Sequence, residues 1–271
     1  MELALNGATI MKADLVTDIE AASEAGFSYL EIWAAKLREF LKSRTTRELQ
    51  GLLAARSIAP YSINSIERVT FRDERGHASL LVECEEICEL ASMIGCPYVV
   101  VVPGLVTDGV TRERVVDESS CVLDEMAGIA SRFRVKLAFE FLGQAGCSVQ
   151  TLDLASDIVE RVGRADVGLV LDSFHFYAGG SRLESIEALN PERLFIFHIN
   201  DAEDLPRDRL EDRHRLMPGM GILPLRQIVD SLEKIGYTGA ASVEIFRPEY
   251  WERDPREVAR EAYSRAAQII A

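Results

Sequence analysis

The 271-residue sequence predicts an α/β fold, a single (β/α)8 TIM barrel that spans residues 1–271 as one domain. Short β-rich runs alternate with longer amphipathic segments along the whole chain, without a linker or a change of composition between them. Several of these short runs are apolar throughout, as parallel strands covered on both faces are. The runs number eight, and no GxGxxG follows the first of them, which disfavours the alternative of a doubly wound open sheet.

The expected elements follow one another in a regular order. The first strand, at residues 2–6, precedes a helical segment over residues 14–26, in which apolar residues recur every three or four positions. A second long amphipathic segment covers residues 112–133. Gly26 and Gly236 each follow a helical run, where a left-handed residue commonly ends a helix. The other strands are expected at residues 28–33, 60–64, 97–102, 135–141, 167–172, 193–200 and 241–246.

The net negative charge of the chain disfavours a nucleic-acid partner. Acidic residues number 44 and basic residues 30, so the formal net charge is −14. This field repels phosphate backbones, and no basic groove offsets it, so we expect no nucleic-acid partner. A small polyol or sugar ketone, neutral or weakly charged, is the expected substrate.

Cysteine usage and the N-terminus indicate the compartment. The five cysteines form no zinc-type CxxC pair, and Cys84 and Cys88 are spaced as core residues of a helix, which favours a reducing compartment. The N-terminal residues lack the features of a signal peptide, and no apolar run is long enough to span a bilayer. We therefore expect a cytoplasmic protein without membrane contact. A homo-oligomer is compatible with this picture, but no exposed apolar stripe marks an interface.

Four consecutive strands of the expected barrel each carry one ionisable residue at the carboxyl end. Burying such a group without a partner is costly, so each residue needs an explanation. Taken singly, each has an ordinary one: Asp172 could cap the next helix, His198 could be a satisfied core histidine, and the glutamates could pair with arginines. The four residues are Glu140, Asp172, His198 and Glu244.

Taken together, these four residues predict a metal site. Barrel active sites lie at the carboxyl ends of the strands, and the separations of 32, 26 and 46 residues match whole βα units. Three carboxylates and one imidazole suit a single divalent ion, Mn²⁺, Zn²⁺, Co²⁺ or Mg²⁺. The cation would also offset the repulsion among clustered carboxylates.

His175 follows Asp172 by three residues and is expected on the loop beyond the strand, within reach of a substrate. The alternative is a histidine packed between Phe174 and Phe176. Trp33, at the end of the second strand, and Trp251, after the last, could wall a pocket or seal the rim of the barrel. Glycines in the segment PGMG, residues 218–221, could cradle an anion, which is a weak signal.

Several segments resemble the xylose-isomerase-like superfamily of sugar isomerases and epimerases, and within it the inosose (2-keto-myo-inositol) isomerases of inositol catabolism. The similar segments are LAFEFLG, VGLVLDSFHF, FIFHINDAEDLP, RLMPGMG and ASVEIFRPEYW. The resemblance implies that Glu140, Asp172, His198 and Glu244 hold the metal. It also implies substrate contacts by His175 and by Arg215, although Arg213 and His214 compete for the latter assignment. Asn64 could line the substrate loop after the third strand, with a solvated lid as the alternative for this loop.

The resemblance implies an isomerase that moves a carbonyl to the adjacent carbon of a cyclic ketone through an enediolate, with Glu140 and Glu244 exchanging the proton and His175 assisting. Ketose 3-epimerisation and the dehydration of inosose or 3-dehydroshikimate need the same proton abstraction and stay open as alternatives. A non-catalytic polyol-binding protein is a further alternative. Apurinic-site nuclease activity is disfavoured, because four histidines are few for a trinuclear site and the net charge repels DNA.

Overall fold

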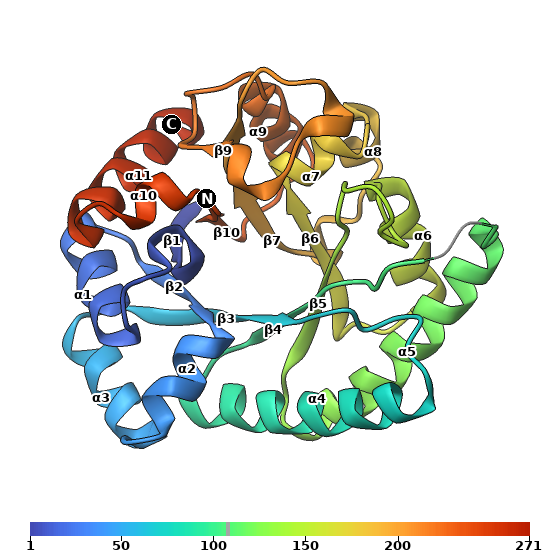
Figure 1. Ribbon diagram of the computed structural model, residues 1–271, viewed down its shortest axis with the longest axis horizontal. Helices are drawn as coiled ribbons and strands as arrows, with labels where there is room; N and C mark the ends of the chain where they lie inside the picture. The colour runs from blue at the N-terminus through green and yellow to red at the C-terminus, as the bar shows by residue number, and fades with distance from the viewer. Residues whose placement is uncertain (107–108) are drawn as a thin grey trace.

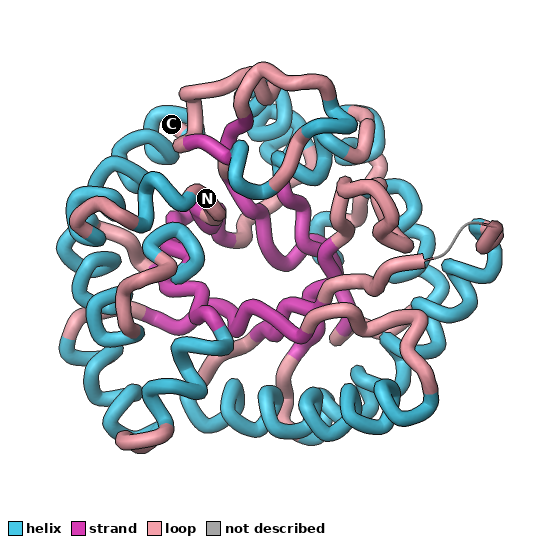
Figure 2. The backbone as a smooth tube through the Cα atoms, viewed as in Figure 1, coloured by secondary structure: helices cyan, strands magenta, loops and turns pink. Residues whose placement is uncertain are grey.

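Eight parallel strands close into a barrel surrounded by helices in the computed structural model, which describes residues 1–106 and 109–271 (Figures 1 and 2). Each strand pairs with its neighbour in parallel register, and the first strand closes the barrel against the last. The predicted (β/α)8 fold is therefore confirmed. In their order around the barrel the strands are β1 (Glu2–Asn6), β10 (Ala240–Val243), β7 (Leu194–Ile199), β6 (Val167–Asp172), β5 (Lys136–Glu140), β4 (Tyr98–Val101), β3 (Ala59–Ile66) and β2 (Tyr29–Trp33).

Helices form the outer layer, and their ends follow local sequence signals. In α1 the Asp14 side chain accepts a hydrogen bond from the Thr17 amide at the start, and Gly26, with φ of 99°, ends the helix as predicted. No helix within the described residues is long and apolar enough to cross a membrane. The helices are α1 (Leu15–Ala25), α2 (Ala34–Leu41), α3 (Thr46–Ala55), α4 (Glu74–Ile94), α5 (Arg112–Arg132), α6 (Leu152–Val162), α7 (Ser173–Ala178), α8 (Leu183–Glu187), α9 (Leu225–Lys234), α10 (Pro248–Trp251) and α11 (Pro255–Ile270).

The strands begin and end within one residue of the sequence-based expectation, except at two carboxyl ends, which differ by two or three residues. β3 continues to Ile66, two residues beyond the expected end. The last strand ends at Val243, so Glu244 lies just after it rather than within it. The long segment between β7 and α9 holds a small antiparallel pair, β8 (Asp201–Ala202) and β9 (Arg215–Leu216). This pair folds the segment back over the end of the barrel where the ionisable residues lie.

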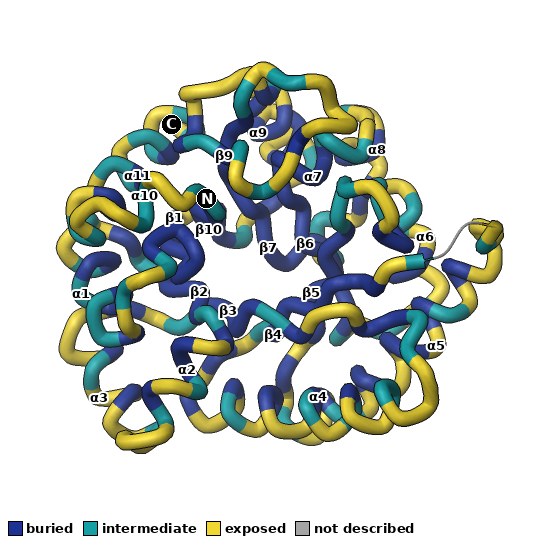
Figure 3. Tube along the Cα trace, viewed as in Figure 1, coloured by how far each residue is buried: buried dark blue, intermediate teal, exposed yellow. Residues whose placement is uncertain are grey.

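The other end of the barrel is closed by a floor of aromatic side chains. Tyr61 packs on Tyr29 and Tyr98 with ring centroids 5.0 and 5.3 Å apart, and Tyr98 stacks on Phe195 at 5.1 Å. The Tyr61 hydroxyl donates to the Phe195 carbonyl and accepts from the Ala240 amide, so the buried polar group is satisfied. Figure 3 shows the strands as an almost continuous buried ring. Aromatic packing therefore closes this end of the barrel, and the predicted ligands lie toward the opposite, carboxyl end of the strands.

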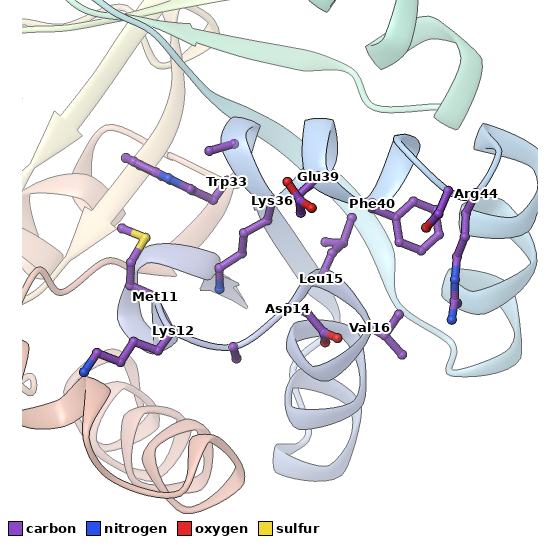
Figure 4. A pocket seen from close by; sticks show the side chains of 13 residues that line it. Met11, Lys12, Asp14, Leu15, Val16, Trp33, Lys36, Glu39, Phe40 and Arg44 are labelled. Atoms are coloured by element: carbon purple, nitrogen blue, oxygen red, sulfur yellow. The ribbon is translucent and has the colours of Figure 1, made fainter.

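A buried ion pair holds the segment after β1 against α2. The Lys36 ammonium lies 2.7 and 2.9 Å from the two carboxylate oxygens of Asp18 and also donates to the carbonyls of Gly7 and Ile10. Both side chains are almost inaccessible to water. Figure 4 shows Lys36 in the wall of a groove of about 540 Å³ that Trp33 also lines. This ion pair fixes one rim of the barrel opening.

We expect Lys36→Met to lower the free energy of unfolding by about 3–5 kcal/mol, because Asp18 would then be a buried charge without a partner. Urea denaturation followed by circular dichroism measures this loss. The double variant Lys36→Met/Asp18→Asn removes the unpaired charge and should recover most of it. A loss below about 1 kcal/mol in the single variant would contradict the role of the pair.

Candidate metal centre

Four neighbouring strands bring Glu140, Asp172, His198 and Glu244 together at the carboxyl end of the barrel. Glu140 and Asp172 end β5 and β6, His198 lies in β7, and Glu244 follows β10. One potential ligand atom from each residue lies within 4.8 Å of all the others, and all four side chains are buried. Asp172 and His198 are direct neighbours in the strand register, which fixes their separation. The structure thus gathers all four predicted ligands in one cluster.

The His198 ring presents different nitrogens to opposite sides. Nδ1 lies 2.8 Å from Glu140 Oε1 and 3.2 Å from Glu244 Oε2, so it faces the cluster. Nε2 lies 3.0 and 3.1 Å from the two carboxylate oxygens of Glu31 on β2. Nδ1 is therefore the nitrogen available to a cation held by the cluster.

Burial and like charges shape the ionisation of the cluster. Burial raises the pKa of the Glu140 carboxyl to about 8, an effect that attraction to His198 opposes and repulsion from Glu244 reinforces. Burial alone would lower the pKa of His198, but the surrounding carboxylates, Glu244 foremost, raise it well above the usual range. The cluster therefore strongly favours a positive charge at its centre.

The donor set fits a divalent cation. Three carboxylates and one imidazole converge without a thiolate, a combination of hard and borderline ligands that Zn²⁺ and Mn²⁺ accept. Clustered carboxylates repel one another in a buried site, and a divalent ion offsets this repulsion more fully than one imidazolium. Glu140, Asp172, Glu244 and the Nδ1 atom of His198 would hold such an ion.

Asp172 both caps a helix and belongs to the cluster. Its Oδ1 accepts a hydrogen bond from the His175 amide at 2.8 Å, which begins α7. Its Oδ2 accepts from Arg215 Nη1 at 2.8 Å and from Asn200 Nδ2 at 2.9 Å. The two interpretations of this residue that the sequence left open are therefore compatible, since each uses a different oxygen.

Arg215 is the basic residue of its segment that reaches the centre. Its guanidinium is 1% exposed and donates from Nη1 to Asp172 and Glu244, at 2.8 and 3.0 Å. Arg213 instead pairs with Glu211 at the surface, and the partly exposed His214 accepts a hydrogen bond from the Glu211 amide. Of the three candidates, Arg215 is therefore the one that faces the centre, while its contact with substrate stays a prediction.

His175 is buried beside this arginine rather than on an open loop. Its Nε2 lies 3.0 Å from Arg215 Nη2, and its ring meets Phe174 edge to face at 5.5 Å. Burial, the largest effect, lowers the pKa of His175, so the neutral imidazole is favoured. Its Nδ1 has no hydrogen-bond partner among the described residues. The structure thus combines the packed and the site-facing interpretations of this residue, and its role toward substrate stays a prediction.

The other predicted contacts lie around the centre in different ways. Asn64 donates through Nδ2 to Glu31 and Glu244, both at 2.7 Å, so its amide nitrogen is engaged by the protein itself. Trp33 packs against Phe246 at 5.6 Å and lines the groove of Figure 4. Trp251 donates to the Ala8 carbonyl and so seals the rim. Substrate binding by Asn64 and Trp33 stays a prediction.

The segment PGMG does not cradle an external anion. The amides of Gly219, Gly221 and Leu223 donate to the carboxylate of Asp201, at distances of 2.9 to 3.0 Å. Because these donors are already used, the anion-binding interpretation is wrong. Asp201 is 1% exposed and instead fixes the segment that carries Arg215.

Sequence reasoning missed several residues of the site. Asn6 ends β1 and Asn200 directly follows β7, and their side chains donate to Glu244 and Asp172. A polar residue at the end of an apolar strand is a sequence signal that could have identified both. Asp212 accepts from Arg215 and from Gln144. Glu31 lies within an apolar strand, and the sequence offers no signal for its contact with His198.

The fold and this cluster define the class of protein: a TIM barrel with a carboxylate–histidine centre at the catalytic end. A family model described as xylose isomerase-like TIM barrel matches residues 19–268, and the chain belongs to this family. Inosose isomerases from Halalkalibacterium halodurans and Bacillus subtilis are 37% and 36% identical to it over its full length, with 97% and 98% of those proteins covered. A crystal structure of the IOLI protein with a bound zinc atom matches with a TM-score of 0.97 at 36% identity, covering 100% of this chain and 98% of that one.

We expect Asp201→Ala to lower the free energy of unfolding by about 3 kcal/mol, because four backbone amides, two of them buried, would lose a charged acceptor. Limited proteolysis should also cut residues 201–221 faster than in the wild type. The exposed Asp208 of the same segment supplies the control, Asp208→Ala, which should behave as the wild type. Equal stability and equal cleavage rates in the two variants would show that Asp201 does not hold the segment.

Proposed function

We propose that the protein is a divalent-metal-dependent isomerase that interconverts keto-inositols or a similar cyclic ketone through an enediolate. The buried four-residue cluster is the observation that carries this proposal, because such a donor set has little structural purpose. The full-length similarity to inosose isomerases supports the choice of substrate. The zinc atom of the IOLI protein supports the choice of a divalent cation.

The reaction requires a base beside the substrate and compensation of the charge that develops on oxygen. A bound divalent ion supplies the electrostatic stabilisation of that charge. Glu140 and Glu244 approach the centre from β5 and from the end of β10, so they can serve two adjacent carbons. One removes the proton next to the carbonyl, and the other returns a proton to the neighbouring carbon.

His175 and Arg215 bind and orient the substrate in this proposal. Their side chains contact each other and cover the cluster from the side of α7 and the β8–β9 pair. The positive charge of Arg215 stabilises an oxygen that gains negative charge, and the neutral His175 relays a hydroxyl proton through a ring nitrogen. Phe174 and Phe246 lie 4.9 and 5.1 Å from the guanidinium and exclude water from it.

The proposed activity also indicates a cellular compartment and a metabolic role. We infer that the enzyme works in the cytoplasm on a small-molecule substrate in carbohydrate metabolism, in inositol catabolism in particular. All five cysteines are free, four of them buried, which suits a reducing compartment. Neither a nucleic acid nor a membrane is needed for this chemistry. A homo-oligomer would be compatible with it.

Proton NMR with 2-keto-myo-inositol in D₂O tests the proposal, using protein stripped with EDTA and then reloaded with Mn²⁺ or Zn²⁺. A metal-dependent second inosose, with deuterium at the exchanged carbon, is the expected result. No isomer with metal bound would contradict the inosose assignment, and ketoses and 3-dehydroshikimate added next would reveal epimerisation or dehydration. Saturable binding of polyols without turnover of any of them would indicate a binding protein.

We expect Glu140→Gln and Glu244→Gln each to reduce turnover by about 10³-fold or more, because glutamine cannot exchange the proton. Rates are measured in the NMR assay, and bound metal is quantified in each variant so that loss of metal is recognised. Glu249→Gln is the matched control, since Glu249 is exposed on α10. Full activity in either glutamine variant would remove that glutamate from the mechanism.

A further inference from the structure

Glu31 is a buried carboxylate that neither the predicted ligand set nor the proposed reaction uses. It lies in the middle of β2 with no exposed surface, on the opposite side of His198 from the other three carboxylates. Both of its oxygens lie within hydrogen-bond distance of His198 Nε2, at 3.0 and 3.1 Å. A carboxylate placed in this way needs a function, because its burial is costly.

The geometry decides where His198 carries its proton. A neutral imidazole has one N–H, and the nitrogen without it is the one that can bind a cation. Glu31 is an acceptor only, so the N–H is stabilised on Nε2, facing β2. Nδ1 is then left with a free lone pair directed at Glu140 and Glu244.

Glu31 also acts on a second member of the cluster through Asn64. The Asn64 amide nitrogen donates to Glu31 Oε1 and to Glu244 Oε1, both at 2.7 Å. One Glu244 oxygen is thereby held toward β3, while the other, Oε2, faces His198 Nδ1 at 3.2 Å. A single buried carboxylate therefore influences the orientation of two of the four cluster residues.

We propose that Glu31 is a positioning residue of the metal centre: it holds the His198 proton on Nε2, presents Nδ1 to the cation and, through Asn64, orients Glu244. This inference rests on the proposed divalent-metal function. Carboxylates that hold the distal N–H of a metal-binding histidine commonly contribute 10- to 100-fold in metal affinity. We expect a contribution of about that size here.

The test compares Zn²⁺ affinities, measured by competition with a chromophoric chelator, for the wild type, Glu31→Gln and Ser62→Ala. Glutamine keeps the shape but has one acceptor and no charge, so its affinity should fall about 10- to 100-fold. Ser62 is the register neighbour of Glu31 and is also buried, but it makes no hydrogen bond with the cluster, so its variant should bind as the wild type does. Equal affinity in all three proteins would overturn the inference while leaving the metal function intact. Absence of Zn²⁺ binding by the wild type would overturn both.

A second readout does not depend on a variant that folds. Long-range ¹H–¹⁵N NMR of the zinc-loaded wild type, labelled at histidine, reports which His198 nitrogen carries the proton. A proton on Nε2 with Nδ1 bound to zinc supports the proposal. A proton on Nδ1, or a zinc-bound Nε2, overturns it, because Glu31 would then face a nitrogen without a proton.

Discussion

The concentration of negative charge at the carboxyl end of the barrel is the constraint on which the rest of the site depends. Four buried carboxylates, counting Glu31, surround the single imidazole of His198, and such a group is stable only when every charge has a partner. The neighbouring polar residues meet this requirement: three asparagine amides and the Arg215 guanidinium all donate to the carboxylates. A divalent cation completes the compensation. The asparagines are Asn6, Asn64 and Asn200. The need to compensate this negative charge therefore explains both the hydrogen bonds around the cluster and the proposed binding of a cation.

The two ends of the barrel have different roles: one is closed by packed aromatic side chains, and the other carries the residues of the proposed reaction. The aromatic floor around Tyr61 closes the end of the barrel opposite the cluster. At the catalytic end, two buried acids hold the irregular segments in place: Asp18 pairs with Lys36 after β1, and Asp201 accepts four backbone amides after β7. Because the segment fixed by Asp201 carries Arg215, these hydrogen bonds also help to hold Arg215 over the centre. This arrangement favours a reaction that must be protected from water.

The fold was predictable because buried parallel strands are apolar runs, and the cluster was predictable because ligands at strand ends break those runs. Glu140, Asp172 and His198 were found in this way, and Glu244 was found although it lies one residue past its strand. Contacts across the barrel could not be found so easily. Glu31 looks like any inward-facing strand residue until β2 and β7 are placed in space, and the hydrogen bonds of PGMG to Asp201 depend on how a long segment folds back. Local sequence patterns predict the strands and helices. The contacts of Glu31 with His198 and of PGMG with Asp201 join residues far apart in the sequence, so local patterns do not reveal them.

We infer that the four residues bind one divalent cation through three carboxylates and His198 Nδ1. Anomalous X-ray diffraction from crystals of the zinc-loaded protein, recorded on either side of the zinc absorption edge, tests it most directly. We expect one strong peak within coordination distance of Glu140, Asp172, Glu244 and the Nδ1 atom of His198. A peak bound elsewhere, or no peak between these side chains at saturating zinc, would contradict it.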